Sequence, residues 1–128
     1  MRGDLYVLED VPAAELRMLY RHAQVTVCPS FGEGFDFSGI EAMRCGSVVA
    51  ASDIPVHHEI FADAADYFSP YSTAKLAQSL QRLMEPDGEQ LRASLQAQGH
   101  IIADRYLPER ILPQWQSFLD PLSTRAAH

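Results

Sequence analysis

The chain has 128 residues, which is enough for one domain with a modest hydrophobic core. Its 17 acidic residues outnumber its 10 basic ones and give a formal net charge of −7, so it lacks the basic clusters that bind a nucleic-acid backbone. No apolar run approaches the roughly 20 residues that cross a bilayer, and we therefore expect no nucleic-acid partner and no transmembrane segment.

The apolar pattern along the chain predicts strands that alternate with helices. The predicted strands are 5–8, 25–28, 47–51 and 66–68, and the predicted helices are 12–23, 38–45, 56–61, 73–84, 90–106 and 108–119. The apolar run within 47–51 is typical of a parallel strand that is covered on both faces. The alternation predicts an α/β fold with a parallel sheet and flanking helices. Ligands of such sheets bind beyond the carboxyl ends of the strands.

One of these strand ends carries the most informative stretch of the chain, 29–46. A short strand leads into a glycine-containing loop, which runs into a helix whose expected N-cap is Ser38. The free N–H groups and the dipole of a helix N-terminus favour a phosphate. Glu33 and Glu41 flank this point, and their carboxylates can accept hydrogen bonds from hydroxyl groups. A nucleotide sugar combines both kinds of group.

The motifs of this stretch resemble a known family. They are Pro29-Ser30, Glu33-Gly34-Phe35, Glu41-Ala42-Met43-x-Cys45-Gly46, Val48-Val49-Ala50-Ala51-Ser52-Asp53-Ile54-Pro55 and Glu59-Ile60. Their order and spacing are similar to those of the retaining GT-B glycosyltransferases of the GT4 family, in which the two glutamates with seven residues between them form the EX7E motif. The resemblance covers nearly the whole chain. It implies an incomplete GT-B C-terminal domain with a Rossmann-like sheet, comprising residues 1–128, with the EX7E segment at 29–46 and C-terminal helices at 73–120.

The resemblance also implies roles for individual residues. Glu33 would be the catalytic-site carboxylate that hydrogen-bonds hydroxyls of the donor sugar, and Glu41 would bind the nucleotide ribose. The residues implied to contact the donor sugar and its diphosphate are Gly34, Phe35, Asp36, Phe37, Ser38 and Gly39. No metal and no cofactor is implied, because the nucleotide sugar is itself the donor substrate. Stabilising a leaving nucleoside diphosphate depends on preorganised dipoles more than on a nucleophile.

The family carries parts that this sequence does not match. These are an acceptor-binding N-terminal domain and two strands that lie, in the family's sheet, between the equivalents of 5–8 and 25–28. We therefore expect a gap in the sheet, whose unpaired strand edge invites a complementing chain or a second copy. Either the chain is a fragment, or a second chain fills the gap, or strand 5–8 moves over. The isolated chain is expected to be inactive. Two other readings are a non-catalytic nucleotide-binding or interaction module, and an unrelated doubly wound phosphate-binding domain.

Several residues in the motif have a structural reading as well. Ser38-x-x-Glu41 is also a capping box, in which Glu41 bonds back to the backbone of Ser38. Phe35 and Phe37 can be packing residues or platforms for the sugar. Asp53, together with Ser52, can cap the helix that follows Pro55.

Other residues are expected to be structural or to lie on the surface. Cys28 and Cys45 form no CxxC pair and are expected to be reduced, in a protein of the cytoplasm, where no signal peptide is needed. His57 and His58 are adjacent and point to different sides of a helix, so we expect surface residues rather than metal ligands. Trp115 is expected in the core or at a helix-docking contact.

Overall fold

The computed structural model describes residues 3–125, so the predicted domain 1–128 extends beyond the described residues at both ends. Its sheet has three parallel strands, β1 (Thr26–Cys28), β2 (Val49–Ser52) and β3 (Ala65–Phe68), in the order β1-β2-β3. The register places Val27 opposite Ala50 and Ala51 opposite Tyr67. The expected α/β fold with a Rossmann-like parallel sheet is thereby confirmed.

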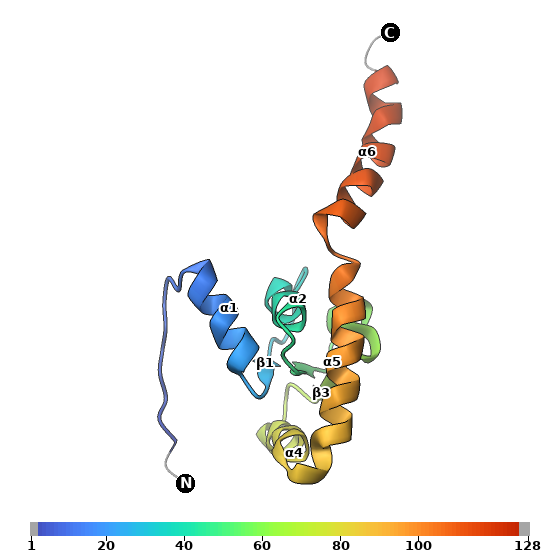
Figure 1. Ribbon diagram of the computed structural model, residues 1–128. Helices are drawn as coiled ribbons and strands as arrows, with labels where there is room; N and C mark the ends of the chain where they lie inside the picture. Colours follow the sequence, from blue (N-terminus) through green and yellow to red (C-terminus); the bar gives the residue numbers. More distant parts are fainter. Residues whose placement is uncertain (1–2, 126–128) are drawn as a thin grey trace.

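Helices connect and follow these strands (Figure 1). They are α1 (Ala13–His22), α2 (Phe37–Arg44), α3 (Pro55–Phe61), α4 (Thr73–Met84), α5 (Glu89–Asp104) and α6 (Pro108–Arg125), with short 3₁₀ turns at Ala62–Ala64 and Pro86–Gly88. Gly46 follows the C-terminus of α2 with φ +84°, a conformation that glycine adopts without strain. The first and last residues of each helix lie close to the predicted positions, except that α6 continues past residue 119.

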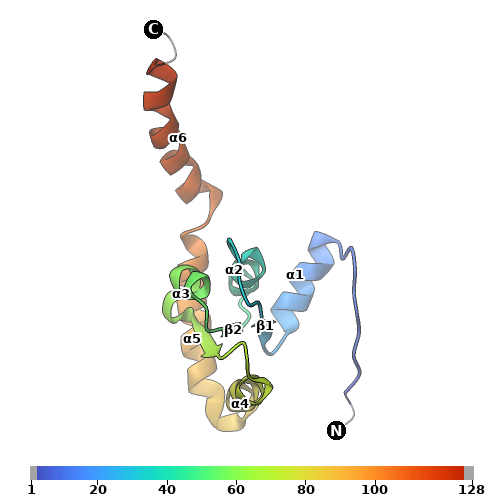
Figure 2. The ribbon, with the colours of Figure 1, turned by 180° about the vertical axis from the view of Figure 1, so that it is seen from behind.

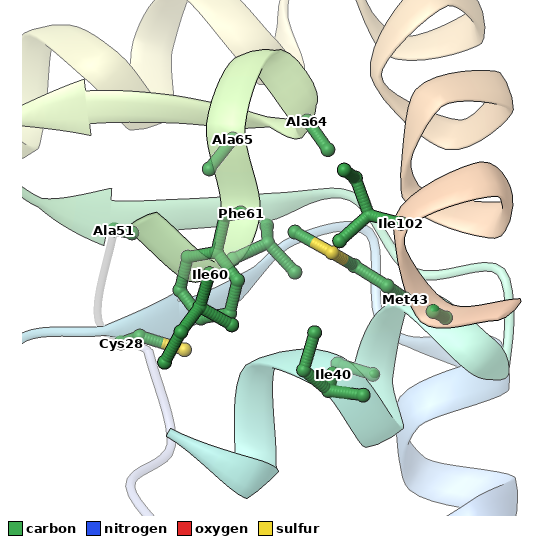
Figure 3. Packing of buried hydrophobic residues seen from close by; sticks show 12 residues of the cluster. Cys28, Ile40, Met43, Ala51, Ile60, Phe61, Ala64, Ala65 and Ile102 are labelled. Carbon is green, nitrogen blue, oxygen red and sulfur yellow. The ribbon is translucent and has the colours of Figure 1, made fainter. Parts of the chain in front are cut away.

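Both faces of the sheet are covered, and β2 shows this most clearly. Val49 and Ala51 face α2, α3 and α5, where Met43, Phe61 and Ile102 complete the larger core cluster (Figure 3). Side chains of a strand alternate between the two faces, so the residues between these point the other way. Every residue of β2 is buried, as expected for a central parallel strand.

The second face is covered by α4 and the first half of α5. Ala50 of β2 packs there with Phe68 of β3, Leu83 of α4 and Leu95 of α5. A polar contact also joins α4 to the sheet, because Arg82 Nη2 lies 2.6 Å from Asp66 Oδ2 and the buried hydroxyl of Ser79 donates to the same carboxylate oxygen. The two helical layers therefore fix β2, and with it the carboxyl end of the sheet.

The predicted strand at 5–8 was wrong. This segment forms no strand and runs alongside α1, apart from the sheet in both views (Figures 1 and 2). Its apolar side chains are exposed, Leu5 by 90% and Val7 by 79%. A strand forms only where a neighbour accepts its backbone hydrogen bonds, and none of the described residues lies beside this segment as such a neighbour. The outer edge of β1 likewise has no strand partner within residues 3–125.

The expected place of Trp115 in the core was also wrong. Helix α6 extends away from the sheet and from the other helices (Figures 1 and 2). Trp115 is 57% exposed, and its ring contacts that of Phe118 on the same helix. Cys28 and Cys45 are free thiols, as expected. Within the part of the chain that the structure describes, no helix combines the length and apolarity needed to cross a membrane.

Candidate functional site

The loop between β1 and α2 carries Glu33 at the carboxyl edge of the sheet. Glu33 is exposed, and the hydroxyl of Ser30 donates to its Oε1 over 2.5 Å. A Cβ added at Gly32 or Gly34 would meet nothing within 4 Å, so the loop around Glu33 is open. The structure thus leaves the Glu33 carboxylate exposed and orients it through the hydroxyl of Ser30.

Helix α2 is capped by Asp36 and not by Ser38. The Oδ1 atom of Asp36 accepts a hydrogen bond from the Gly39 N–H over 3.0 Å, and Asp36 has the extended backbone of an N-cap residue. Ser38 is therefore the second residue of the helix. Asp and Ser are about equally favourable N-caps, so the sequence pattern did not separate them. The Ser38–Glu41 capping box is not formed, because Glu41 lies outside the third helical position that it requires.

This cap narrows the set of backbone donors at the N-terminus of α2. The Gly39 N–H is already used by Asp36. Within residues 3–125, the N–H groups of Phe37 and Ser38 donate to no protein acceptor, as is usual for the first positions of a helix. These two donors remain open to an anionic group.

Gly39 has a packing reason for being glycine. A Cβ at this position would lie 2.2 Å from Cζ and 2.7 Å from Cε1 of Phe61, whose ring is completely buried. The missing side chain lets α2 approach α3 closely, and so fixes the N-terminus of α2 against the core.

Glu41 is exposed on α2 and lines a pocket of about 300 Å³. The pocket lies between α1, α2 and the junction of α5 with α6, and its walls include Leu16, Tyr20, Arg44 and Tyr106. Burial raises the pKa of the Tyr20 phenol, a hydrogen bond with Ser38 lowers it, and the nearby charge of Glu41 raises it further. Glu41 therefore stands at the wall of a mainly apolar pocket that also holds polar groups.

The two aromatic residues of the loop have different environments. Phe35 is half-buried, packs against the larger core cluster and makes an edge contact with Tyr106 at a centroid distance of 5.2 Å. Phe37 lies 4.7 Å from the ring of Phe35 and is 69% exposed. Phe35 is thus a packing residue, whereas the ring of Phe37 is open to a ligand.

Three buried polar side chains lie beneath this loop, and two of them were missed as contributors to the site. Asp36, Ser52 and His57 are 7%, 0% and 0% exposed. His57 Nε2 lies 3.2 Å from Asp36 Oδ2, and His57 Nδ1 lies 2.8 Å from the carbonyl oxygen of Ser52. The expectation that His57 is a surface residue was wrong, because the third position of α3 faces the core. Nothing in the local pattern distinguishes a histidine at this core-facing position from one on the surface.

Cys28 and Asp53 complete the surroundings. Burial, and then the nearby charges of Asp36 and Glu33, raise the pKa of the Cys28 thiol to about 12, so Cys28 stays protonated and is not a nucleophile. Asp53 does not cap α3, whose N-cap is Ile54 without a side-chain bond. Its Oδ1 instead lies 2.7 Å from Nε2 of His58, and both side chains are exposed. His58 is therefore a surface residue, as expected.

Comparison with known proteins identifies the family of this arrangement. The profile of the family described as "Glycosyl transferases group 1" matches residues 2–86, about two thirds of the chain. The chain belongs to this family. It is a partial GT-B glycosyltransferase domain, and the glutamates of the loop and of α2 both lie within the matched residues.

The chain is also similar to individual glycosyltransferases. It is 44% identical over 70 residues to the O-antigen chain mannosyltransferase RfbU of Salmonella typhimurium strain LT2, covering 55% of this chain and 20% of that protein. It is 39% identical over 83 residues to the O-antigen chain mannosyltransferase B of Escherichia coli, covering 62% and 22%. The third relative is the alpha-maltose-1-phosphate synthase of Mycolicibacterium smegmatis, with 38% identity over 61 residues, 48% of this chain and 16% of that protein. The matched part thus spans about a fifth of the length of these relatives.

Proposed function

We propose that this chain forms part of the donor-binding half of a retaining glycosyltransferase. The donor sugar lies at Glu33, the diphosphate at the N-terminus of α2, and the nucleotide ribose at Glu41 in the adjoining pocket. Gly34 and Phe35 shape the loop beneath the sugar, and the exposed ring of Phe37 flanks the donor. Because two of the relatives are named mannosyltransferases, a mannosyl group is the first sugar to test.

The observation that carries this proposal is that Glu41 takes no part in capping α2. Asp36 caps α2, so Glu41 is exposed at a pocket with its carboxylate available. The open N–H groups of Phe37 and Ser38 lie on the same helix, two turns or less from Glu41. A single nucleotide sugar can therefore contact the helix N-terminus and Glu41 at the same time.

The chemistry that these groups support is electrostatic. Backbone N–H groups and the positive end of the α2 dipole stabilise the charge that develops on the leaving nucleoside diphosphate. Glu33 accepts hydrogen bonds from sugar hydroxyls and holds the anomeric carbon in place. No metal ion is part of the proposal.

The test uses the 128-residue chain, titrated with GDP, UDP and GDP-mannose while backbone amide resonances are followed by NMR. Amides 34–40 should shift first. Glu41→Gln should weaken both GDP and GDP-mannose by about 1 kcal/mol or more, because charge-assisted hydrogen bonds are about twice as strong as neutral ones. Glu33→Gln is the matched control, and it should weaken GDP-mannose while leaving GDP unchanged. Shifts confined to residues 90–125, or equal loss of GDP affinity in both variants, would refute the assignment.

We further propose that the 128-residue chain binds nucleotides without transferring sugar. Its match spans about a fifth of the relatives' length, and losing one positioned transition-state donor alone costs about 10²–10³ in rate. Turnover of GDP-mannose by the purified chain, measured as released GDP, would contradict this.

The alternative function is a non-catalytic module that pairs with another chain, and one observation favours it. The Thr26 N–H donates to Val48, so the N–H of Val27 points to the open edge of β1, where a strand of a complementing chain or second copy can add. Val27→Pro removes that donor and keeps the bonds to β2. Light scattering should show concentration-dependent association of the wild type and a monomeric variant. A wild-type monomer at all concentrations would exclude self-association by this edge.

A further inference from the structure

His57 is the most deeply buried ionisable side chain of the site, and each of its two ring nitrogens has a polar partner. It is 0% exposed, and it stacks on Phe61 at a centroid distance of 5.1 Å with an interplanar angle of 26°. A buried polar ring is costly unless its nitrogens have partners. Nδ1 meets the carbonyl oxygen of Ser52 at 2.8 Å, and Nε2 meets Asp36 Oδ2 at 3.2 Å.

The polar partners of the imidazole fix the orientation of the ring. The carbonyl oxygen of Ser52 only accepts, so Nδ1 donates to it. Nε2 then faces Asp36 Oδ2 at 3.2 Å, and this contact holds the Asp36 carboxylate inward.

Ser52 and His57 together form an anchor for the loop, and this anchor also contacts the other end of the loop, through the Ser52 hydroxyl. The Ser52 hydroxyl donates to the carbonyl oxygen of Ser30 over 2.5 Å, and the Ser30 hydroxyl donates to Glu33. Ser52 and His57 thus tie the loop where it leaves β1 and where it enters α2. The side chain of Glu33 is connected to this anchor through a single residue.

We propose that His57 is a positioning residue for the donor-binding loop, a role that rests on the proposed function of that loop. By binding Oδ2 of Asp36, His57 leaves Oδ1 aimed at the Gly39 N–H. The carboxylate is turned away from the surface, where its charge would repel a diphosphate, and the N–H groups of Phe37 and Ser38 stay open. Without His57, Asp36 is free to rotate toward these donors.

Two variants separate positioning from space filling. The amide nitrogen of His57→Gln reaches the place of Nε2 and can donate to Asp36, whereas that of His57→Asn reaches only the place of Nδ1 and the Ser52 carbonyl. Both variants remove the aromatic ring and its stacking on Phe61. His58→Asn is the matched control, because His58 is an exposed neighbour on the same helix.

The experiment measures two properties of the 128-residue chain, at a temperature where every variant is folded. The first is the affinity for GDP from the shifts of amides 34–40. The second is hydrogen exchange of the Gly39 amide, which reports the Asp36 cap directly. In His57→Asn, we expect GDP affinity to fall about tenfold and Gly39 exchange to accelerate about tenfold, as for the loss of a hydrogen bond to a charged group. His57→Gln should stay close to the wild type in both, and His58→Asn should change neither.

Equal effects of His57→Gln and His57→Asn on both measurements would overturn the proposal, because the ring would then act only by filling space. If GDP and UDP shift no amide of the wild type, the proposed function fails. The Gly39 exchange rates of the two variants then decide the positioning of Asp36 by themselves, with equal rates rejecting it.

Discussion

Replacing Gly39 by alanine separates two physical effects of opposite sign. Alanine is favoured over glycine within a helix by about 1 kcal/mol, so local propensity alone predicts that Gly39→Ala stabilises α2. In the structure, however, the new Cβ would lie 2.2 Å from Cζ of Phe61. That ring is completely buried and stacks on His57, so it cannot turn aside without disturbing the core.

Overpacking costs about 1–3 kcal/mol, and a Cβ that would lie 2.2 Å from a buried ring carbon belongs to the upper part of that range, about 2–3 kcal/mol, so the packing effect wins. Gly39→Ala should lower the free energy of unfolding by about 1–2 kcal/mol, which corresponds to a fall in Tm of about 4–8 °C for a domain of this size. Circular dichroism melts of the wild type and the variant measure this difference. Gly32→Ala is the matched control, because a Cβ at Gly32 meets nothing within 4 Å.

A second variant keeps the reasoning testable. Phe61→Leu shortens the ring that the new methyl group would meet, so adding Gly39→Ala to Phe61→Leu should cost much less than adding it to the wild type. An unchanged or raised Tm for Gly39→Ala alone would show that α2 and α3 are not in the close contact described.

Two further predictions follow from the described contacts. Between about pH 9 and pH 12, the free energy of unfolding should fall less steeply in Cys28→Ala than in the wild type. Burial raises the pKa of the folded thiol from 9.0 to about 12, so the unfolded chain loses the proton first as the pH rises. Urea denaturation at each pH measures the free energy of unfolding, and equal slopes for the two proteins would contradict this prediction. Asp66→Ala should lower the free energy of unfolding by about 1–3 kcal/mol, because it leaves the buried hydroxyl of Ser79 without its acceptor. Arg82→Ala should lower it by no more than about 1 kcal/mol, because the Arg82 side chain is 51% exposed. Equal losses of stability in thermal melts of the two variants would contradict this prediction.

The order and bounds of most helices and strands were predictable because their signals are local. Helix α4 begins and ends at the predicted residues, and a short turn at Pro86–Gly88 separates it from α5, in the interval between the two predicted helices. The motifs that surround Glu33 and Glu41 predicted a glycosyltransferase, whereas the spacing of the two glutamates alone is a weak signal, and the family profile confirmed the family. The roles of Glu33 and Glu41 in binding a donor stay predictions, since no ligand contact tests them.

The choice of helix cap was harder to predict from sequence. Asp36 and Ser38 are both good N-cap residues two positions apart, and the sequence pattern favoured Ser38 because a glutamate follows it by three residues. In the structure Asp36 caps α2, and Nε2 of His57, 21 residues further along the chain, lies 3.2 Å from the other oxygen of its carboxylate. The local sequence pattern gives no sign of this contact between distant segments.

The sequence by itself determined what depends on neighbours along the chain: the alternating elements, the parallel sheet and the motif that marks the glycosyltransferase family. The tertiary structure alone decided which side chains of those elements meet. It buried His57, made Gly39 a packing position and left segment 5–8 outside the sheet. The physical reason is that burial and strand pairing depend on segments far apart in sequence, whereas propensity, capping preference and periodicity depend on residues only a few positions apart.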